Sequence, residues 1–178
     1  MKSFLFFLFC ISVYSTELKE ENFSIAETKI LFTSETSEET IKGIGKIAKG
    51  NISMKEKTFQ VEIDLSDWKT NNKLQTNHMH DNYLETEKFQ TAYYSGKIIS
   101  YSNTTGEAEL VGTLKLHGIE KKEFVTKGKL LKKDSGYIYS SEFTINLKDF
   151  KIDVPKLLFL KISENITVKT SFNLKAEK

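Results

Sequence analysis

Three histidines are the residues of this sequence whose chemistry would suit a metal. His78 and His80 lie two positions apart, and His117 lies far along the chain. Three imidazoles can form a catalytic zinc site. However, residues two apart on a helix diverge by about 200°, and the segment around His78 has helical spacing. We therefore interpret these histidines as polar groups at the surface or at a pocket mouth, and a zinc-dependent enzyme is the less favoured hypothesis.

The sequence also lacks the residue patterns of other catalytic sites. The single cysteine, Cys10, lies in the N-terminal apolar run, and no serine occupies a G-x-S-x-G turn. The glycines within 42–46 lack the third glycine and the strand-to-helix context of a phosphate loop. We expect these glycines to allow sharp strand curvature instead. The prediction is a protein without catalytic residues, metal or cofactor.

The charge pattern argues against a nucleic-acid partner. The chain carries 26 basic and 24 acidic residues, for a net charge of +2, and they are spread along its whole length. Every basic residue is lysine, so the chain lacks arginine, the side chain best suited to bidentate recognition of phosphate or guanine. We predict no binding to nucleic acid.

Residues 1–15 are expected to form an export signal. Lys2 precedes an apolar run over 4–13, and cleavage is predicted after Ser15. This run is shorter than the roughly 20 residues that span a bilayer as a helix, and no later segment approaches that length. We therefore predict a soluble, periplasmic or secreted domain over 16–178. Lipid attachment at Cys10 is the less favoured alternative, since no small residue precedes it.

Period-two alternation dominates the rest of the chain and predicts strands with one buried face. In the clearest run, over 107–117, the even-numbered residues from Ala108 to Leu116 are apolar or glycine, and polar residues alternate with them except at Val111. The expected strands cover 23–34, 41–54, 59–65, 92–102, 107–117, 123–132, 139–147 and 166–174.

Turns and one insertion separate these runs. Turn-forming residues at 103–106, 117–118 and 133–136 predict that successive strands are antiparallel neighbours. The polar segment 70–87 breaks the alternation. We expect a short helix there, because four of its residues have the spacing of one helical face. These residues are Leu74, His78, Met79 and Tyr83.

These elements predict an all-β fold: a single antiparallel, lipocalin-like β-barrel of about eight strands with a short helical insertion around 70–87. Closure would hide the inner side chains and remove the exposed edges, and a sandwich is the alternative. A barrel of about eight strands is either filled by its side chains or just wide enough for one small ligand. The sequence leaves both possibilities open, because a packed core and a pocket lining use the same residue types.

The candidate ligand-binding residues follow from these positions. In the barrel interior they are Phe59, Val61, Ile63, Tyr94, Leu110, Leu114, Leu116, Tyr139, Phe143 and Phe172. At the helical insertion and pocket mouth they are His78, Met79, His80, Tyr83 and Leu84.

Three motifs resemble those of the YceI-like family of exported, lipid-binding, lipocalin-like barrels. The first covers 76–85 and continues into 88–92, where the family has an H-[LM]-R segment followed by a conserved aromatic and proline pattern. The second, 112–121, is similar to the family's G-x-L-T-I-x-G-V-x-K hairpin, and the third, 149–152, is similar to D-F-G-I. Their order and separation also agree, so the resemblance spans nearly all of the predicted domain.

The resemblance implies an elongated apolar interior that holds a hydrophobic small molecule, such as an isoprenoid chain or a fatty-acid-like lipid. The alternative is an interaction or stress-response protein with a filled core on the same scaffold; the oligomeric state, a homodimer included, stays open. Three residues depart from the family pattern: His80 replaces Arg, Gln90 replaces Pro and Lys151 replaces Gly. If the arginine that the family has at this position contacts a ligand headgroup or fixes the helix, His80 would change which headgroup is accepted.

Overall fold

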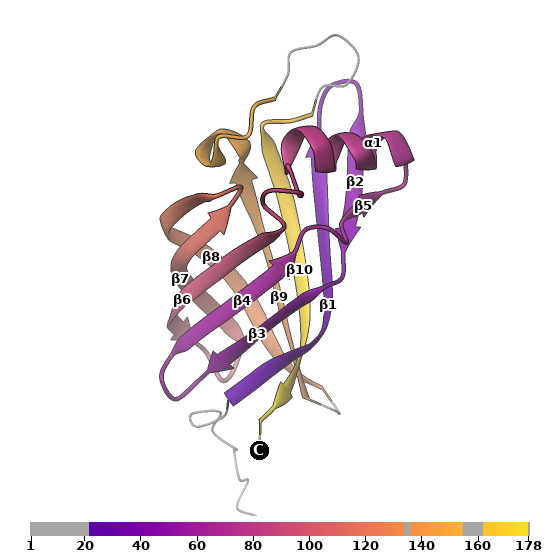
Figure 1. The fold of residues 1–178 in the computed structure, drawn as a ribbon. Coiled ribbons are helices and arrows are strands. Elements are labelled where there is room, and N and C mark those ends of the chain that lie inside the picture. The colour runs from indigo at the N-terminus through magenta and orange to yellow at the C-terminus, as the bar shows by residue number, and fades with distance from the viewer. Residues whose placement is uncertain (1–21, 134–135, 155–161, 178) are drawn as a thin grey trace, which may run out of the picture.

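Eight antiparallel strands close into one barrel (Figure 1). The computed structural model describes residues 22–133, 136–154 and 162–177. Pairing of the last strand with the first completes the ring, so the predicted single antiparallel barrel is confirmed. Its strands are β1 (Asn22–Glu35), β3 (Ala48–Ser53), β4 (Thr58–Asp64), β6 (Thr91–Tyr101), β7 (Glu107–Leu116), β8 (Ile119–Lys133), β9 (Gly136–Asn146) and β10 (Asn165–Ala176).

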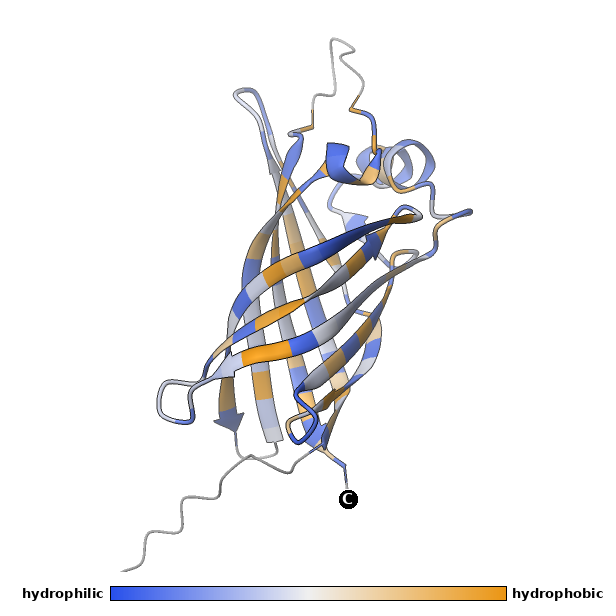
Figure 2. Cartoon of the chain, turned by 90° about the vertical axis from the view of Figure 1, so that its left-hand side faces the viewer, coloured by the Kyte–Doolittle hydropathy of each residue, from blue (hydrophilic) through white to orange (hydrophobic). Residues whose placement is uncertain are grey.

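Hydrophobic and hydrophilic residues alternate along the strands, as the sequence pattern indicates (Figure 2). In β10 the buried positions are Val168, Thr170, Phe172 and Leu174, and Lys169 between them is exposed. The apolar faces of the strands meet inside the barrel, because closure leaves that space as the one shielded from water. The interior is therefore the structure's main apolar region and the place to look for a site.

The prediction of one continuous strand over 41–54 is wrong, because the strand is interrupted. It forms β2 (Thr40–Gly45) and β3, which pair with opposite ends of β1. At the break, backbone groups find other partners: Lys46 N–H donates to the Asp67 carboxylate at 2.7 Å, and Asp64 N–H donates to the Ile47 carbonyl at 3.0 Å. The β2 half leaves the ring and pairs with the two-residue β5 (Lys69–Thr70).

The helical insertion lies at the upper end of the barrel in Figure 1. It consists of α1 (Lys73–His78) and one π-helical turn, η2 (Met79–Tyr83). The Asn72 side chain caps α1 by accepting from Leu74 N–H at 2.8 Å. Leu74 was expected on the buried face, but it is 59% exposed. The helical residues, 73–83, cover less than the expected segment 70–87. The face that points into the barrel begins after Leu74.

A second short element covers the same end. The expected strand over 139–147 stops at Asn146, whose side chain accepts from Lys148 N–H and starts the 3₁₀ turn η3 (Leu147–Phe150). Phe150 and Ile152 are almost completely buried. They belong to the motif 149–152, which therefore supplies apolar anchors for this end of the barrel.

The 117–118 turn has the predicted form. His117 and Gly118 have φ values of 51° and 73° and join β7 to β8 in a two-residue hairpin, the geometry of a type I′ turn. The expected signal over 1–15 and parts of the 133–136 turn lie outside the described residues. Within the described ranges, no helix is long and apolar enough to cross a bilayer.

Candidate ligand-binding site

Two apolar cavities lie inside the barrel. The upper cavity, beneath α1 and η2, has a volume of about 110 Å³. Its wall combines the insertion with side chains of β1, β7, β9 and β10, including Phe32, Leu116, Ile145 and Val168. The lower cavity, in the barrel body, has a volume of about 90 Å³. Both are lined mainly by aliphatic and aromatic side chains, the environment that suits a hydrocarbon ligand.

The two cavities follow one another along the same strands. On each of β7, β9 and β10, one residue lines the upper cavity and the residue two positions away along the strand lines the lower cavity. These pairs are Leu116 and Leu114, Ile145 and Phe143, and Val168 and Thr170. Two strand residues span about 6.6–6.8 Å. A single layer of side chains therefore separates the cavities, which share one axis.

The structure brings together the interior residues expected from the sequence. Leu116 lines the upper cavity. The others line the lower cavity: Phe59, Val61, Ile63, Tyr94, Leu110, Leu114, Tyr139, Phe143 and Phe172. Their contact with a ligand stays a prediction.

Four of the five residues expected at the insertion line the upper cavity, namely His78, Met79, Tyr83 and Leu84. Burial raises the pKa of the Tyr83 phenol above its usual value.

His80 was expected with them, but it is not among the residues that line either cavity. Its Nε2–H donates to the Trp68 carbonyl at 2.8 Å, and its Nδ1 lies within hydrogen-bond distance of the Thr86 hydroxyl, at 3.1 Å. The reason is the helical rotation of about 200° between His78 and His80. His80 therefore fixes the insertion to the chain before β5.

Sequence reasoning missed an aromatic pair in the upper cavity. The rings of Phe32 and Trp68 are stacked, with centroids 5.3 Å apart and an interplanar angle of 11°. Glycines on β2 make room for them: a Cβ at Gly43 would lie 2.2 Å from the Phe32 ring, and one at Gly45 would lie 2.2 Å from the Trp68 ring. These glycines therefore permit close side-chain approach, whereas the sequence led us to expect strand curvature.

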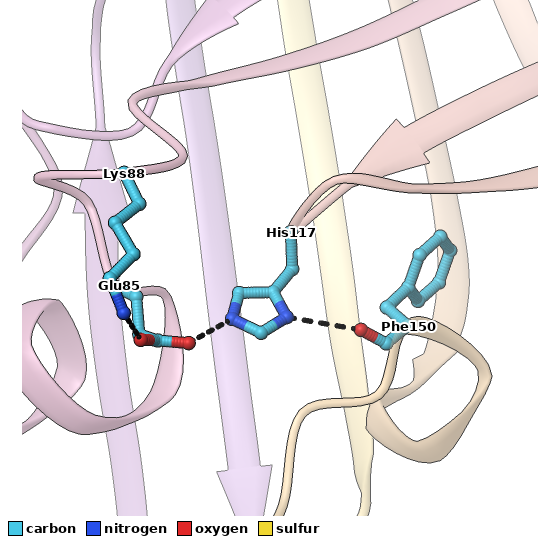
Figure 3. A network of polar contacts seen from close by, with 4 residues as sticks. All are labelled: Glu85, Lys88, His117 and Phe150. Atoms are coloured by element: carbon cyan, nitrogen blue, oxygen red, sulfur yellow. Dashed lines mark hydrogen bonds and ion pairs between the residues drawn. The ribbon is translucent and has the colours of Figure 1, made fainter.

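A polar network holds the upper end together (Figure 3). Glu85 accepts from the Lys88 ammonium at 2.6 Å and lies 2.8 Å from His117 Nε2, and His117 Nδ1 lies 3.2 Å from the Phe150 carbonyl. The Lys88 ammonium, and then His117, hold the pKa of Glu85 below its usual value. Phe89 packs edge-on against the imidazole.

This network joins the three motifs singled out from the sequence. Glu85 ends the first, His117 lies in the second and Phe150 in the third. A further ion pair, between Lys121 and Asp149, joins the second and third motifs again. The motifs thus describe how the insertion, the β7–β8 hairpin and η3 are fastened together.

The histidines occupy separate environments. His78 Nδ1 lies 2.9 Å from the Asn82 amide, His80 bonds near Trp68, and His117 bonds to Glu85. Across the part of the chain that the structure describes, no three His, Cys, Asp or Glu side chains come together in a group that could hold a metal ion.

Comparisons with known proteins agree with this architecture. A family model described as the YceI-like domain matches residues 22–174. A polyisoprenoid-binding domain from Saccharophagus degradans superposes with a TM-score of 0.73 at 17% identity, over 87% of this chain and 98% of that one.

Two further solved structures share the fold. BcnA from Burkholderia cenocepacia has a TM-score of 0.68 at 11% identity, over 82% and 94% of the two chains. The YceI protein of Campylobacter jejuni has a TM-score of 0.64 at 20% identity, over 81% and 89%. A search of curated proteins found no match. The family match covers nearly all of the described barrel, its strands and its upper insertion, and the chain belongs to the YceI-like family.

Proposed function

We propose that this protein binds a long-chain lipid, an isoprenoid chain in the first instance, inside the barrel and catalyses no reaction. The observation that carries the proposal is the pair of apolar cavities on one axis. The Saccharophagus degradans domain with the same fold is described as polyisoprenoid-binding, which supports this ligand class.

Energetics favours an elongated ligand. Burying a hydrocarbon chain contributes about 0.8 kcal/mol per CH₂ group, so affinity grows with buried length. Each cavity alone is smaller than the roughly 150 Å³ of an engineered cavity that holds benzene. A long chain must therefore occupy both cavities and displace the intervening layer that contains Leu114 and Leu116. Met79, a flexible side chain at the upper cavity, suits such repacking.

The proposed setting is outside the cytoplasm. Residues 1–15, with Lys2 before an apolar run over 4–13, have the composition of an export signal. We propose that it is removed and that the barrel acts in the periplasm or as a secreted protein.

Trp68 makes the proposal testable in solution. It is the only tryptophan of the sequence and it lines the upper cavity. Titration with geranylgeraniol should change its fluorescence saturably, and native mass spectrometry of protein from its own host should show a bound apolar molecule.

A matched pair of variants tests the path of the chain. Leu114→Phe enlarges a side chain in the layer between the cavities, and Lys115→Phe places the same ring on the outside of the barrel. Binding of geranylgeraniol should weaken at least tenfold in the first variant and stay unchanged in the second. An empty protein that gives no response to geranylgeraniol would contradict the carrier proposal and favour an interaction protein with a filled core.

A further inference from the structure

A group of hydroxyls interrupts the apolar lining of the lower cavity. We call it the hydroxyl cluster, and it comes from β6, β8, β9 and β10: Tyr94, Thr126, Tyr139, Ser141 and Thr170. Thr126 and Thr170 are 3% and 7% exposed. Polar groups at this depth are costly unless they are hydrogen-bonded, so each hydroxyl needs a partner.

Most of the cluster is satisfied within the protein. The Tyr94 hydroxyl donates to the Phe124 carbonyl at 2.9 Å and lies 3.4 Å from the Thr126 hydroxyl. The hydroxyls of Ser141 and Thr170 pair at 2.7 Å. These bonds hold the hydroxyls in place around the cavity.

Tyr139 is the exception. Its hydroxyl oxygen is buried and has no hydrogen-bond partner among the described residues. Space is kept for it by Gly128, where a Cβ would lie 2.7 Å from this oxygen. A buried hydroxyl without a partner lowers stability, because it loses its hydrogen bonds to water and gains none in the protein. The Tyr139 hydroxyl therefore lies at the cavity wall without a hydrogen-bond partner, and this arrangement lowers the stability of the fold.

The surroundings define what could bond to it. Among the described residues, the lining of the lower cavity includes no Lys, His, Asp or Glu. A carboxylate or phosphate would be buried there without a counter-ion, which is strongly unfavourable. Burial also raises the pKa of the Tyr139 phenol, and the nearby Thr126 and Ser141 hydroxyls lower it in part although neither meets hydrogen-bond geometry with the phenol. The phenol therefore keeps its proton at neutral pH and can donate.

We propose that Tyr139 donates a hydrogen bond to an uncharged oxygen of the bound lipid, so that the polar group of a long-chain alcohol, amide or ketone lies within the barrel and not at its mouth. This inference rests on the proposed function and adds the chemical class of the ligand and its direction. The hydrocarbon chain would extend from the hydroxyl cluster toward the upper cavity, because the two cavities share one axis.

Competition for a fluorescent probe tests this inference. In this assay the purified protein is loaded with N-phenyl-1-naphthylamine and titrated with 1-hexadecanol or with hexadecane, which differ only in the hydroxyl. One added hydrogen bond of about 1.4 kcal/mol corresponds to a tenfold preference for the alcohol. Tyr139→Phe should reduce this preference to near unity. Tyr93→Phe is the matched control and should retain it, since Tyr93 is exposed and lines neither cavity.

The outcomes separate the two proposals. If wild type binds both compounds equally, or if Tyr139→Phe retains the tenfold preference, the hydroxyl does not recognise the ligand and water is its partner. If neither compound displaces the probe from wild type, the proposed lipid binding itself fails. Thermal unfolding provides an independent check, because Tyr139→Phe removes an unpaired hydroxyl and should not lower the melting temperature of the ligand-free protein.

Discussion

His117 Nε2 lies 2.8 Å from Glu85 Oε2, and this contact ties the end of the helical insertion to the β7–β8 hairpin (Figure 3). The imidazole side chain is only 11% exposed, so the contact is shielded on the histidine side. Since the insertion forms part of the upper cavity wall, the network around His117 helps to determine how that end of the barrel opens.

Removal of the imidazole should loosen the insertion. His117→Ala loses hydrogen bonds to Glu85 and to the Phe150 carbonyl, and we expect it to lower the free energy of unfolding by about 1–2 kcal/mol. Amide hydrogen exchange should accelerate most at Leu84 and Phe89. His78→Ala is the control, because that ring bonds only to the exposed Asn82 among the described contacts. Equal exchange rates in the two variants would show that the network does not hold the insertion.

Acid should weaken the same network. The folded state lowers the pKa of Glu85 from 4.5, so its contribution to stability is present above that pH and is lost as pH falls through the lower folded value. Lys88 has the opposite sign: its pKa is raised from 10.5, so its contribution is lost above that pH. We expect the melting temperatures of wild type and Glu85→Gln to differ at pH 7 and to converge below pH 4.5. A difference that persists in acid would contradict this assignment.

Lys151 should be replaceable by glycine with a gain in stability. It follows η3 with φ 55° and ψ 32°, the left-handed conformation that favours glycine. This geometry explains why the resemblance placed glycine at this position. Lys151→Gly should raise the free energy of unfolding by about 0.5–1 kcal/mol in chemical denaturation. Lys151→Ala also removes the lysine side chain but keeps the unfavourable backbone angle, so it should give no such gain.

Gly45→Ala should disturb the upper cavity. The added methyl would overlap the Trp68 ring, so we expect a loss of about 1–3 kcal/mol in unfolding free energy and a shift in tryptophan emission. Lys42→Ala, at an exposed position on the same strand, should change neither. Unaltered emission in Gly45→Ala would mean that Trp68 has room to move and is not constrained by β2.

The fold follows from the sequence to a large extent because strand periodicity is a local property. Alternation of apolar and polar residues along 107–117 predicts which side chains of β7 face inward, since successive residues must point to opposite faces. The His117–Gly118 turn is equally local, as few residue pairs favour two positive φ values. These patterns, repeated along the chain, are sufficient to predict an antiparallel barrel and the place of its insertion.

The site depended on tertiary structure, because its decisive contacts join residues that are distant in the sequence. Alternation places Tyr139 inside the barrel, but its lack of a partner depends on how closely the Thr126 hydroxyl approaches it from the neighbouring strand β8. Likewise, the space beside Gly45 has meaning only once Trp68 packs against it. Periodicity determines which face a side chain takes, and closure of the barrel determines which side chains meet and how much space they leave.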